Sequence, residues 1–532
     1  MSNAAPPSPT QVPTPGVPWF GLAAVLLATF LSTLNGRLSS FGLADVRGAV
    51  HAGFDEGAWI TTAQTAAQML VTPFAMWCGM VFGPRRPLLW SSAAFAVISL
   101  LKAWSADLPT LLVLQFLGGI PSGFFVPLTL GFVLRNTPPR TWAYGVALYA
   151  LSLELSSNIS ASLEGWYVEH LDWRWIFWQS VPLALAMTLC LGFGTKPDPA
   201  PPQRPPADHF GLAVGGVGLA VLYAALDQGN RLDWLNSGLI CGLLLAGSLL
   251  VVGFLVHEVR TPHPLVNFRV ALAPTLLTQL VLIGFVRLTT LATAFVIPQF
   301  LGAVRAFKAL ETGQTLIWIA APQLLTCLLA GYALRRTDAR IVGAVGFFCI
   351  ALACLWVAYG LTPLWGSDEF LPSQLLQAIG QSFAVSGIVF FGVLHLRPEE
   401  ALTFGTALQV TRLMGGEIGQ AFITTFQRIR EQVASNLLGQ HVQVGDGQVV
   451  HRLQQYAAAT AKAGEPSTAP HRAMALLGSV VRNAATTQSI IDAFVVIALL
   501  TALALLVLVV RNKAPVGPAS HQPLFGAREA KP

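Results

Sequence analysis

Charged residues are scarce in this chain. Asp, Glu, Lys and Arg make up 11% of its 532 residues and hydrophobic residues 54%, whereas roughly 25% charged residues is typical of soluble domains. This scarcity excludes a large soluble domain. Apolar stretches of about 20 residues, long enough to cross a bilayer, recur along nearly the whole chain. The sequence therefore predicts a polytopic membrane protein.

The sequence also lacks the motifs of nucleotide, metal and catalytic chemistry. It has no GxxxxGK[ST] loop, its six cysteines lie in apolar stretches without a CxxC pair, and no histidines stand at ligand spacing. No nucleophile, base and orienting residue stand out as a set. We therefore expect no enzymatic activity, no cofactor, no disulfide and no metal site, and we expect an ion gradient as the energy source.

Fourteen apolar segments are predicted as transmembrane helices, arranged as six, two and six, in an all-α fold. The first six lie near residues 20–46, 57–82, 88–105, 108–134, 142–168 and 174–194. Two additional helices lie near 211–227 and 236–257. The last six lie near 273–302, 312–334, 341–360, 371–396, 402–430 and 487–510.

Polar and proline-rich segments set the expected domain boundaries. Residues 1–19 carry no Lys or Arg, which argues against a cleavable signal peptide and favours a disordered cytoplasmic tail. The expected units are a first six-helix bundle, a cytoplasmic linker, the two additional helices, a second six-helix bundle and a cytoplasmic tail, at 20–194, 195–210, 211–257, 273–510 and 511–532. A periplasmic loop at 431–486, amphipathic around residues 449–456, is expected on the membrane surface or folded back on it.

The positions of the basic residues predict the orientation. When alternate loops are assigned to opposite sides, one side holds sixteen Lys and Arg. The opposite short loops hold six, namely Arg47, Lys102, Arg174, Arg231, Arg305 and Lys308. The positive-inside rule then places both termini in the cytoplasm. Because the net charge of +6 is scattered over short loops, topology explains it, and we expect no nucleic-acid partner.

Seven segments carry a resemblance to a known family. In chain order they are LN..LSSFGLAD, EGAWITTA, IPSGFFVPL, LDWRWIFWQSVP, NRLDWL, PLVNF and VTRLMGGEIGQA. Together they resemble the fourteen-helix EmrB/QacA-type drug:proton antiporters of the major facilitator superfamily. The resemblance implies two pseudosymmetric bundles, a midplane cavity and alternating access in the bacterial inner membrane. For Gram-negative members it further implies a periplasmic membrane-fusion protein and an outer-membrane channel as partners.

The chain departs from this family pattern at charged positions. Asn35 stands where the family usually has a helix 1 aspartate, and Gln115 where helix 4 usually offers an arginine. The loop between helices 2 and 3 keeps Gly83, Arg85 and Arg86 of a conformational motif but lacks its acid. The helix 5 antiporter motif is largely absent. The resemblance thus implies transport more firmly than it implies the usual site of proton coupling.

Charged residues inside the predicted helices are the best functional markers, because such charges are costly in a bilayer and normally face a cavity or a partner. They are Arg37, Arg287, Arg412, Glu154, Glu164 and Glu417. We hypothesise that Glu154 and Glu417 carry protons, and an ion pair with an arginine is the alternative for Glu154. The three arginines, with Asn35 and Gln115, are candidates for the substrate cavity or for ion pairing. Glu164 fits a wetted helix end.

The function predicted is proton-coupled efflux of small amphipathic compounds, in the manner of multidrug or toxic-compound resistance. The three arginines favour weakly acidic or zwitterionic aromatic substrates. Two alternatives stay open at this point. One is an uncoupled or inward transporter of organic anions with the same fold, and the other is a non-transporting membrane sensor or scaffold that binds a partner through 431–486.

Overall fold

The computed structural model describes residues 19–136, 141–195, 208–261, 274–396, 400–443, 445–461 and 468–511. Within these ranges all regular structure is helical, as the apolar segments predict. The two terminal tails and most of the 195–210 linker lie outside the described residues.

The first six predicted segments form helices. They are α1 (Trp19–Phe41), α4 (Trp59–Phe82), α5 (Arg85–Lys102), α6 with α7 (Leu108–Gly123, Phe125–Asn136), α8 (Trp142–His170) and α9 with α10 (Trp175–Trp178, Ser180–Gly194). The first helix ends earlier than the expected residue 46, and two short helices follow it, α2 (Leu43–Ala49) and α3 (Phe54–Gly57). The chain passes close to its neighbours at Gly42, where a Cβ would lie 2.4 Å from Ile176 Cδ1.

The remaining segments are also helical. The additional pair is α11 (His209–Gly229) and α12 (Gly238–Arg260). The later helices are α14 (Pro274–Thr289), α15 (Ile297–Ala303), α16 (Ala309–Arg336), α17 (Ala339–Gly360), α18 (Leu371–Leu394), α19 (Ala401–Gly439), α20 (Gly447–Ala461) and α21 (Ala469–Val509). A π-helical turn, η3 (Ala292–Val296), lies between α14 and α15. Pro298 has no N–H with which to bond the carbonyl of Ala294 in the ordinary helical pattern, which accounts for the irregular turn.

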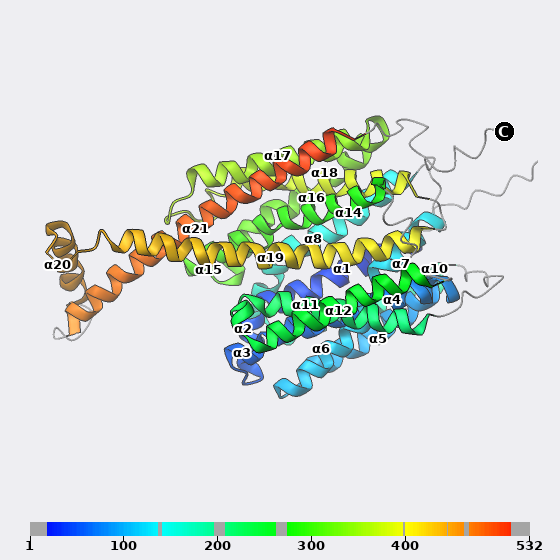
Figure 1. The fold of residues 1–532 in the computed structure, drawn as a ribbon, viewed down its shortest axis with the longest axis horizontal. Helices are drawn as coiled ribbons and strands as arrows, with labels where there is room; N and C mark the ends of the chain where they lie inside the picture. The colour runs from blue at the N-terminus through cyan, green and yellow to red at the C-terminus, as the bar shows by residue number, and fades with distance from the viewer. Residues whose placement is uncertain are drawn as a thin grey trace, which may run out of the picture.

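The helices assemble into two halves. In the first half α1 packs against α8 and α10, and α4 against α6; in the second half α17 packs against α18 and α21, and α14 against α19. The halves meet where α8 contacts α16 and where α19 contacts α4 and α7. The additional helix α11 packs on both α4 and α19, so it borders both halves. In Figure 1 the second half lies above, and α4, α5, α6, α11 and α12 lie below.

Eleven helices in the described ranges are long and apolar enough to cross a membrane. The prediction of fourteen spans therefore remains a prediction for α5, α8 and α19, which are not among the eleven. Each of these three carries charged residues near or within its apolar stretch, which lowers its hydropathy, although each packs against helices that qualify.

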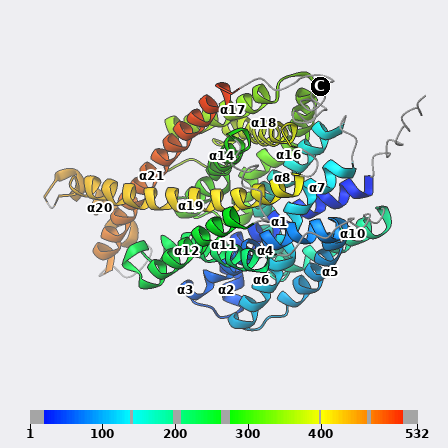
Figure 2. The same ribbon diagram turned by 45° about the vertical axis from the view of Figure 1, so that its right-hand side comes forward.

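The long loop prediction was wrong in its geometry. α19 has 39 residues and α21 has 41, which at 1.5 Å per residue makes each about 60 Å long, roughly twice the hydrocarbon thickness. Both views show the two helices projecting beyond the bundle, with α20 packed on α21 at the tip (Figure 1, Figure 2). The amphipathic segment around 449–456 lies in α20, which packs on α21 but has no fully buried residue. We call this side of the molecule the hairpin end and the opposite side, where residues 19 and 511 lie, the terminal end.

Candidate functional site

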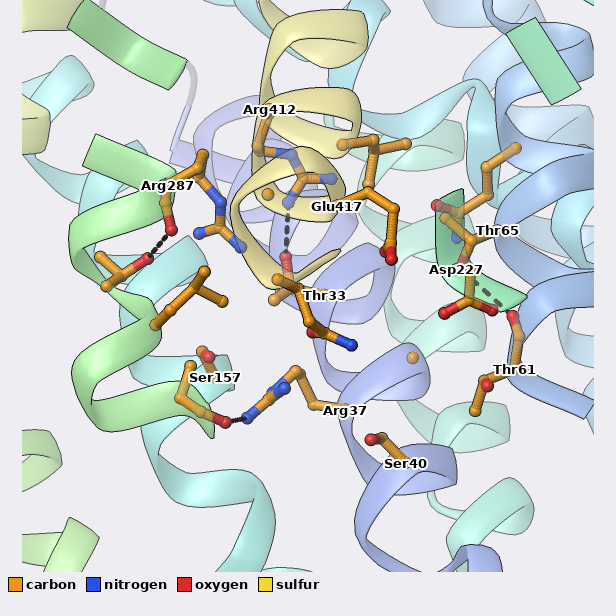
Figure 3. A pocket seen from close by; sticks show the side chains of 18 of the residues that line it. Thr33, Arg37, Ser40, Thr61, Thr65, Ser157, Asp227, Arg287, Arg412 and Glu417 are labelled. Atoms are coloured by element: carbon orange, nitrogen blue, oxygen red, sulfur yellow. Dashed lines mark hydrogen bonds between the residues drawn. The ribbon is translucent and has the colours of Figure 1, made fainter. Parts of the chain in front are cut away.

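A cavity of about 950 Å³, counting its open mouth, lies between the two halves. Its walls come from α1, α4, α8, α11, α14, η3 and α19. Four of the charged residues predicted inside the membrane line it, namely Arg37, Arg287, Arg412 and Glu417. In Figure 3, Arg287 lies on one side, Glu417 and Asp227 on the other, and Arg37 and Arg412 between them.

The three arginines of the cavity, Arg37, Arg287 and Arg412, each form a hydrogen bond or an ion pair with another residue. Arg287 Nη1 lies 3.5 Å from Glu154 Oε1, so the partner of Arg287 comes from another helix, α8. Arg412 donates hydrogen bonds to Gln409 Oε1 and, at 3.0 Å, to Thr33 Oγ1 of α1. Arg37 donates to the carbonyl oxygen of Ala294, the oxygen that Pro298 cannot bond. Three cations with one paired carboxylate make this side of the cavity basic.

A second, smaller cavity adjoins the basic side. Arg287, Arg412 and Glu154 border it, and the rest of its wall is almost entirely apolar. The apolar lining includes Leu153, Ile283, Val286, Val385, Ile388 and Leu408. The two cavities share Arg287 and Arg412, so the guanidinium groups stand where a polar chamber meets an apolar one.

Carboxylates occupy the other side of the cavity. Glu417 comes from α19, and Asp227 and the Tyr223 ring come from the additional helix α11. A further cavity toward the hairpin end shares Asp227, Glu417 and Gln420 with the central one. The sequence interpretation missed Asp227, because it stands at the end of an apolar segment and resembles an ordinary polar helix end. The continuation of α11 to Gly229 places Asp227 within the helix, at the wall of the cavity.

Two of the five residues predicted for the substrate cavity or ion pairing, Asn35 and Gln115, do not line the central cavity. Asn35 is 1% exposed and donates to Ser180 Oγ at 3.4 Å, on the side of α1 away from Arg37. Two residues of helix turn the chain by about 200°, so this divergence follows from the sequence spacing. Gln115 is fully buried and accepts a hydrogen bond from Lys102.

Lys102 was expected in an outer loop, and that expectation was wrong. Its side chain is 0% exposed, and Nζ lies 2.7 Å from Gln115 Oε1 and 3.4 Å from Gln64 Oε1. It lies over the Phe177 ring, 5.8 Å from the centroid. Gly118 leaves the necessary room, since a Cβ there would lie 2.7 Å from Nζ. We call these five residues the Lys102 pocket. They bury the Lys102 side chain, which the sequence analysis counted among the basic residues of the outer loops.

Glu164 was also interpreted as a wetted helix end, and the structure buries it. It is 1% exposed and lies near Gly42, where a Cβ would be 3.1 Å from Glu164 Oε1. It does not line the central cavity.

The predicted conformational loop lies at the terminal end. Gly83 ends α4 with φ of 74°, a conformation that favours glycine. Arg85 donates to Thr195 Oγ1 at 2.8 Å and to the carbonyl oxygens of Leu191 and Gly192, which close the last turn of α10. Arg86 is exposed. The loop thus fastens α5 to the end of α10.

A cavity lined by charged residues lies between two helical halves of a multi-pass membrane protein. This arrangement is that of a transporter. The family model of the Major Facilitator Superfamily matches residues 25–420, and the chain belongs to that superfamily of transporters. Among the described residues, no group of three or more His, Cys, Asp or Glu is gathered as a metal site requires.

Relatives and solved structures agree with this placement. The multidrug export protein EmrB of Haemophilus influenzae is 25% identical over 429 residues, which cover 79% of this chain and 82% of that protein. The fatty acid resistance protein FarB of Neisseria gonorrhoeae is 23% identical over 424 residues, covering 78% and 82%. The solved proton:xylose symporter XylE shares the fold, with a TM-score of 0.56 at 11% identity over 95% of this chain and 98% of that one.

Proposed function

We propose that this protein is a proton-coupled efflux transporter of small amphipathic compounds that carry an anionic group. The observation that carries the proposal is the place of Arg287 and Arg412, where the polar cavity meets the apolar one. A guanidinium binds a carboxylate or sulfonate through charge-assisted hydrogen bonds, and the apolar chamber beside it accepts a ring or chain. EmrB and FarB, relatives named for multidrug export and fatty acid resistance, support export of amphipathic molecules.

Proton coupling in this proposal uses Glu154 and Glu417. Glu154 is 3% exposed and pairs with Arg287, so an anionic substrate that binds Arg287 competes with the carboxylate for the same guanidinium. A proton on Glu154 would remove that competition, which links the protonation of one group to the occupancy of another. Glu417 lies between the central cavity and the cavity toward the hairpin end, on the route of exchange with that side.

The test uses purified protein in liposomes with an imposed pH gradient and naphthalenesulfonate as a membrane-impermeant amphipathic anion. Wild type should transport the probe and move protons in the opposite direction. Arg287→Met should lose transport of the probe, and Glu154→Gln and Glu417→Gln should uncouple it from the gradient. Arg260→Met is the control, because it removes the same charge at the exposed end of α12.

A different result would contradict each part of the proposal, namely the proton carriers, the coupling and transport itself. If both glutamine variants keep full coupled transport, neither carboxylate is the proton carrier. If probe flux runs down its own gradient with no proton movement, the uncoupled organic-anion transporter describes the protein better. If a correctly folded protein transports no probe, the result favours the alternative of a non-transporting membrane sensor or scaffold.

The orientation and the partners belong to the same proposal. The excess of basic residues on one side supports an orientation with the terminal end in the cytoplasm and the hairpin end in the periplasm of a bacterial inner membrane. The projecting α19–α21 hairpin is then available to a periplasmic membrane-fusion protein and, through it, to an outer-membrane channel. Cysteine accessibility at exposed Gln448 of α20, compared with exposed Arg86, tests the orientation, because only the former should react with an impermeant reagent in intact cells.

A further inference from the structure

We propose that the additional helix α11 is part of the substrate site, and that Asp227 with Glu417 binds the cationic group of zwitterionic substrates. This inference rests on the proposed function, because it assigns the opposite side of the same cavity. It gives a chemical role to α11, one of the two additional helices.

The first support is the placement of α11. Tyr223 and Asp227 form part of the wall of the central cavity, and Asp227 also borders the cavity toward the hairpin end. Figure 3 shows the Asp227 and Glu417 carboxylates near each other on the side of the cavity away from Arg287. Asp227 is an electrostatic neighbour of Glu417.

The second support is how Asp227 is held. Thr62 Oγ1 of α4 donates a hydrogen bond to Asp227 Oδ2, and Gln228 Nε2 donates to the same oxygen at 3.1 Å. The nearby cation, Arg231, is directed elsewhere, with Nε 2.7 Å from Gln228 Oε1 and Nη1 2.6 Å from Asp55 Oδ1. Neutral donors therefore fix the orientation of the carboxylate, and its electrostatic neighbour Arg231 forms its ion pair with Asp55 instead.

The third support is Glu417. Its residue is 7% exposed, it lines the cavity, and among the described residues no Lys, Arg or His forms an ion pair with it. The neutral hydroxyl of Tyr223 is among the groups that interact with it, and both residues line the cavity. Glu154, in contrast, is paired with Arg287 on the basic side. Carboxylates that are withdrawn from water and form no ion pair are unfavourable, so a cationic group of a ligand would stabilise this side of the cavity.

The fourth support is that α11 is fastened to both halves. Thr62 and Asp55 hold it to the first half. In the turn after it, Trp234 Nε1 donates to Thr425 Oγ1 of α19 at 3.0 Å, and Arg428 lies 3.2 Å from Asp233. Hydrogen bonding from Asn236, together with Arg428, holds the pKa of Asp233 below its ordinary value. A helix tied to both halves keeps Asp227 at the cavity wall.

The charges on the two sides make the cavity dipolar. A molecule with an anionic group and an ammonium group can contact the arginines with one end and the Asp227–Glu417 pair with the other. A purely anionic molecule satisfies only the arginines. Asp227 is therefore expected to determine selectivity between the two kinds of substrate, whereas Arg287 is expected to matter for both.

The experiment measures equilibrium binding to the full-length protein in lipid nanodiscs with two matched probes. One is naphthalenesulfonate and the other is its aminomethyl derivative, which adds one ammonium group to the same ring system. Asp227→Asn should weaken binding of the aminomethyl probe about tenfold or more, as expected for loss of a charge-assisted contact, and change binding of the plain sulfonate by less than about twofold. Asp368→Asn is the matched control, because it removes an exposed acid that does not line the central cavity and should leave both affinities unchanged.

Each outcome decides between the two proposals. If Asp227→Asn weakens both probes equally or neither, the inference is overturned while the function stands. If wild type binds neither probe, the proposed function fails and the inference with it. If Asp227→Asn does not fold, Glu417→Gln gives the same test, since it should show the same selective loss of the aminomethyl probe.

Discussion

The central cavity and the Lys102 pocket both contain buried cationic side chains, but the two sites differ in the partners of these side chains and in their access to open space. In the cavity, Arg287 has a carboxylate partner and faces open space. In the Lys102 pocket, the ammonium contacts two amide oxygens and an aromatic ring, no carboxylate of the described residues pairs with it, and its residue is 0% exposed. The first environment can exchange its partner for a ligand, and the second cannot. A buried charge therefore indicates a transport function only when it also faces a cavity.

The largest effect should come from breaking the Arg287–Glu154 pair from the arginine side. Arg287→Met leaves Glu154, which is 3% exposed, without its cation, and loss of one partner of a buried pair costs about 3–5 kcal/mol. Thermal unfolding in detergent should show the loss. The double variant Glu154→Gln/Arg287→Met should recover most of it, because no unpaired charge remains. If the double variant is no more stable than the single, the two side chains do not act as a pair.

A smaller effect is expected in the Lys102 pocket. Lys102→Met fills similar space and removes a buried ammonium, but it leaves the Gln115 and Gln64 oxygens without a donor. Removal of the buried ammonium stabilises the protein and loss of the hydrogen bonds destabilises it, so the unfolding free energy should fall by only about 1 kcal/mol. Transport of naphthalenesulfonate should stay near the wild-type rate. A folded Lys102→Met protein without transport would contradict the distinction drawn between the two sites.

The smallest change in stability is expected when Lys102 is given a carboxylate partner, as Arg287 has in the central cavity. Gln115→Glu places a carboxylate 2.7 Å from Lys102 Nζ, in the position of the present amide oxygen. A buried ion pair gains little over a neutral hydrogen bond once desolvation is counted, so the unfolding free energy should change by less than about 1 kcal/mol. The same unfolding assay checks this, with Gln115→Leu as the comparison that removes the acceptor and should destabilise more.

Most of the fold could be predicted from the sequence, because hydropathy is a local property of the chain. The fourteen predicted segments all coincide with helices, and the segments that resemble the transporter family identified the superfamily. Likewise, the cost of placing charge in a bilayer singled out Arg37, Arg287, Arg412 and Glu417, which the structure gathers around one cavity.

What the sequence could not determine were contacts between distant segments. The pairing of Arg287 with Glu154 joins residues 133 positions apart, and no spacing rule along one helix predicts it. Burial of Lys102 depends on the room left by Gly118 of another helix. The chain by itself determined that this is a helical membrane transporter with charges inside its bilayer region. Only the tertiary structure decided that α11 brings Asp227 beside Glu417, because that juxtaposition depends on three helices packing together.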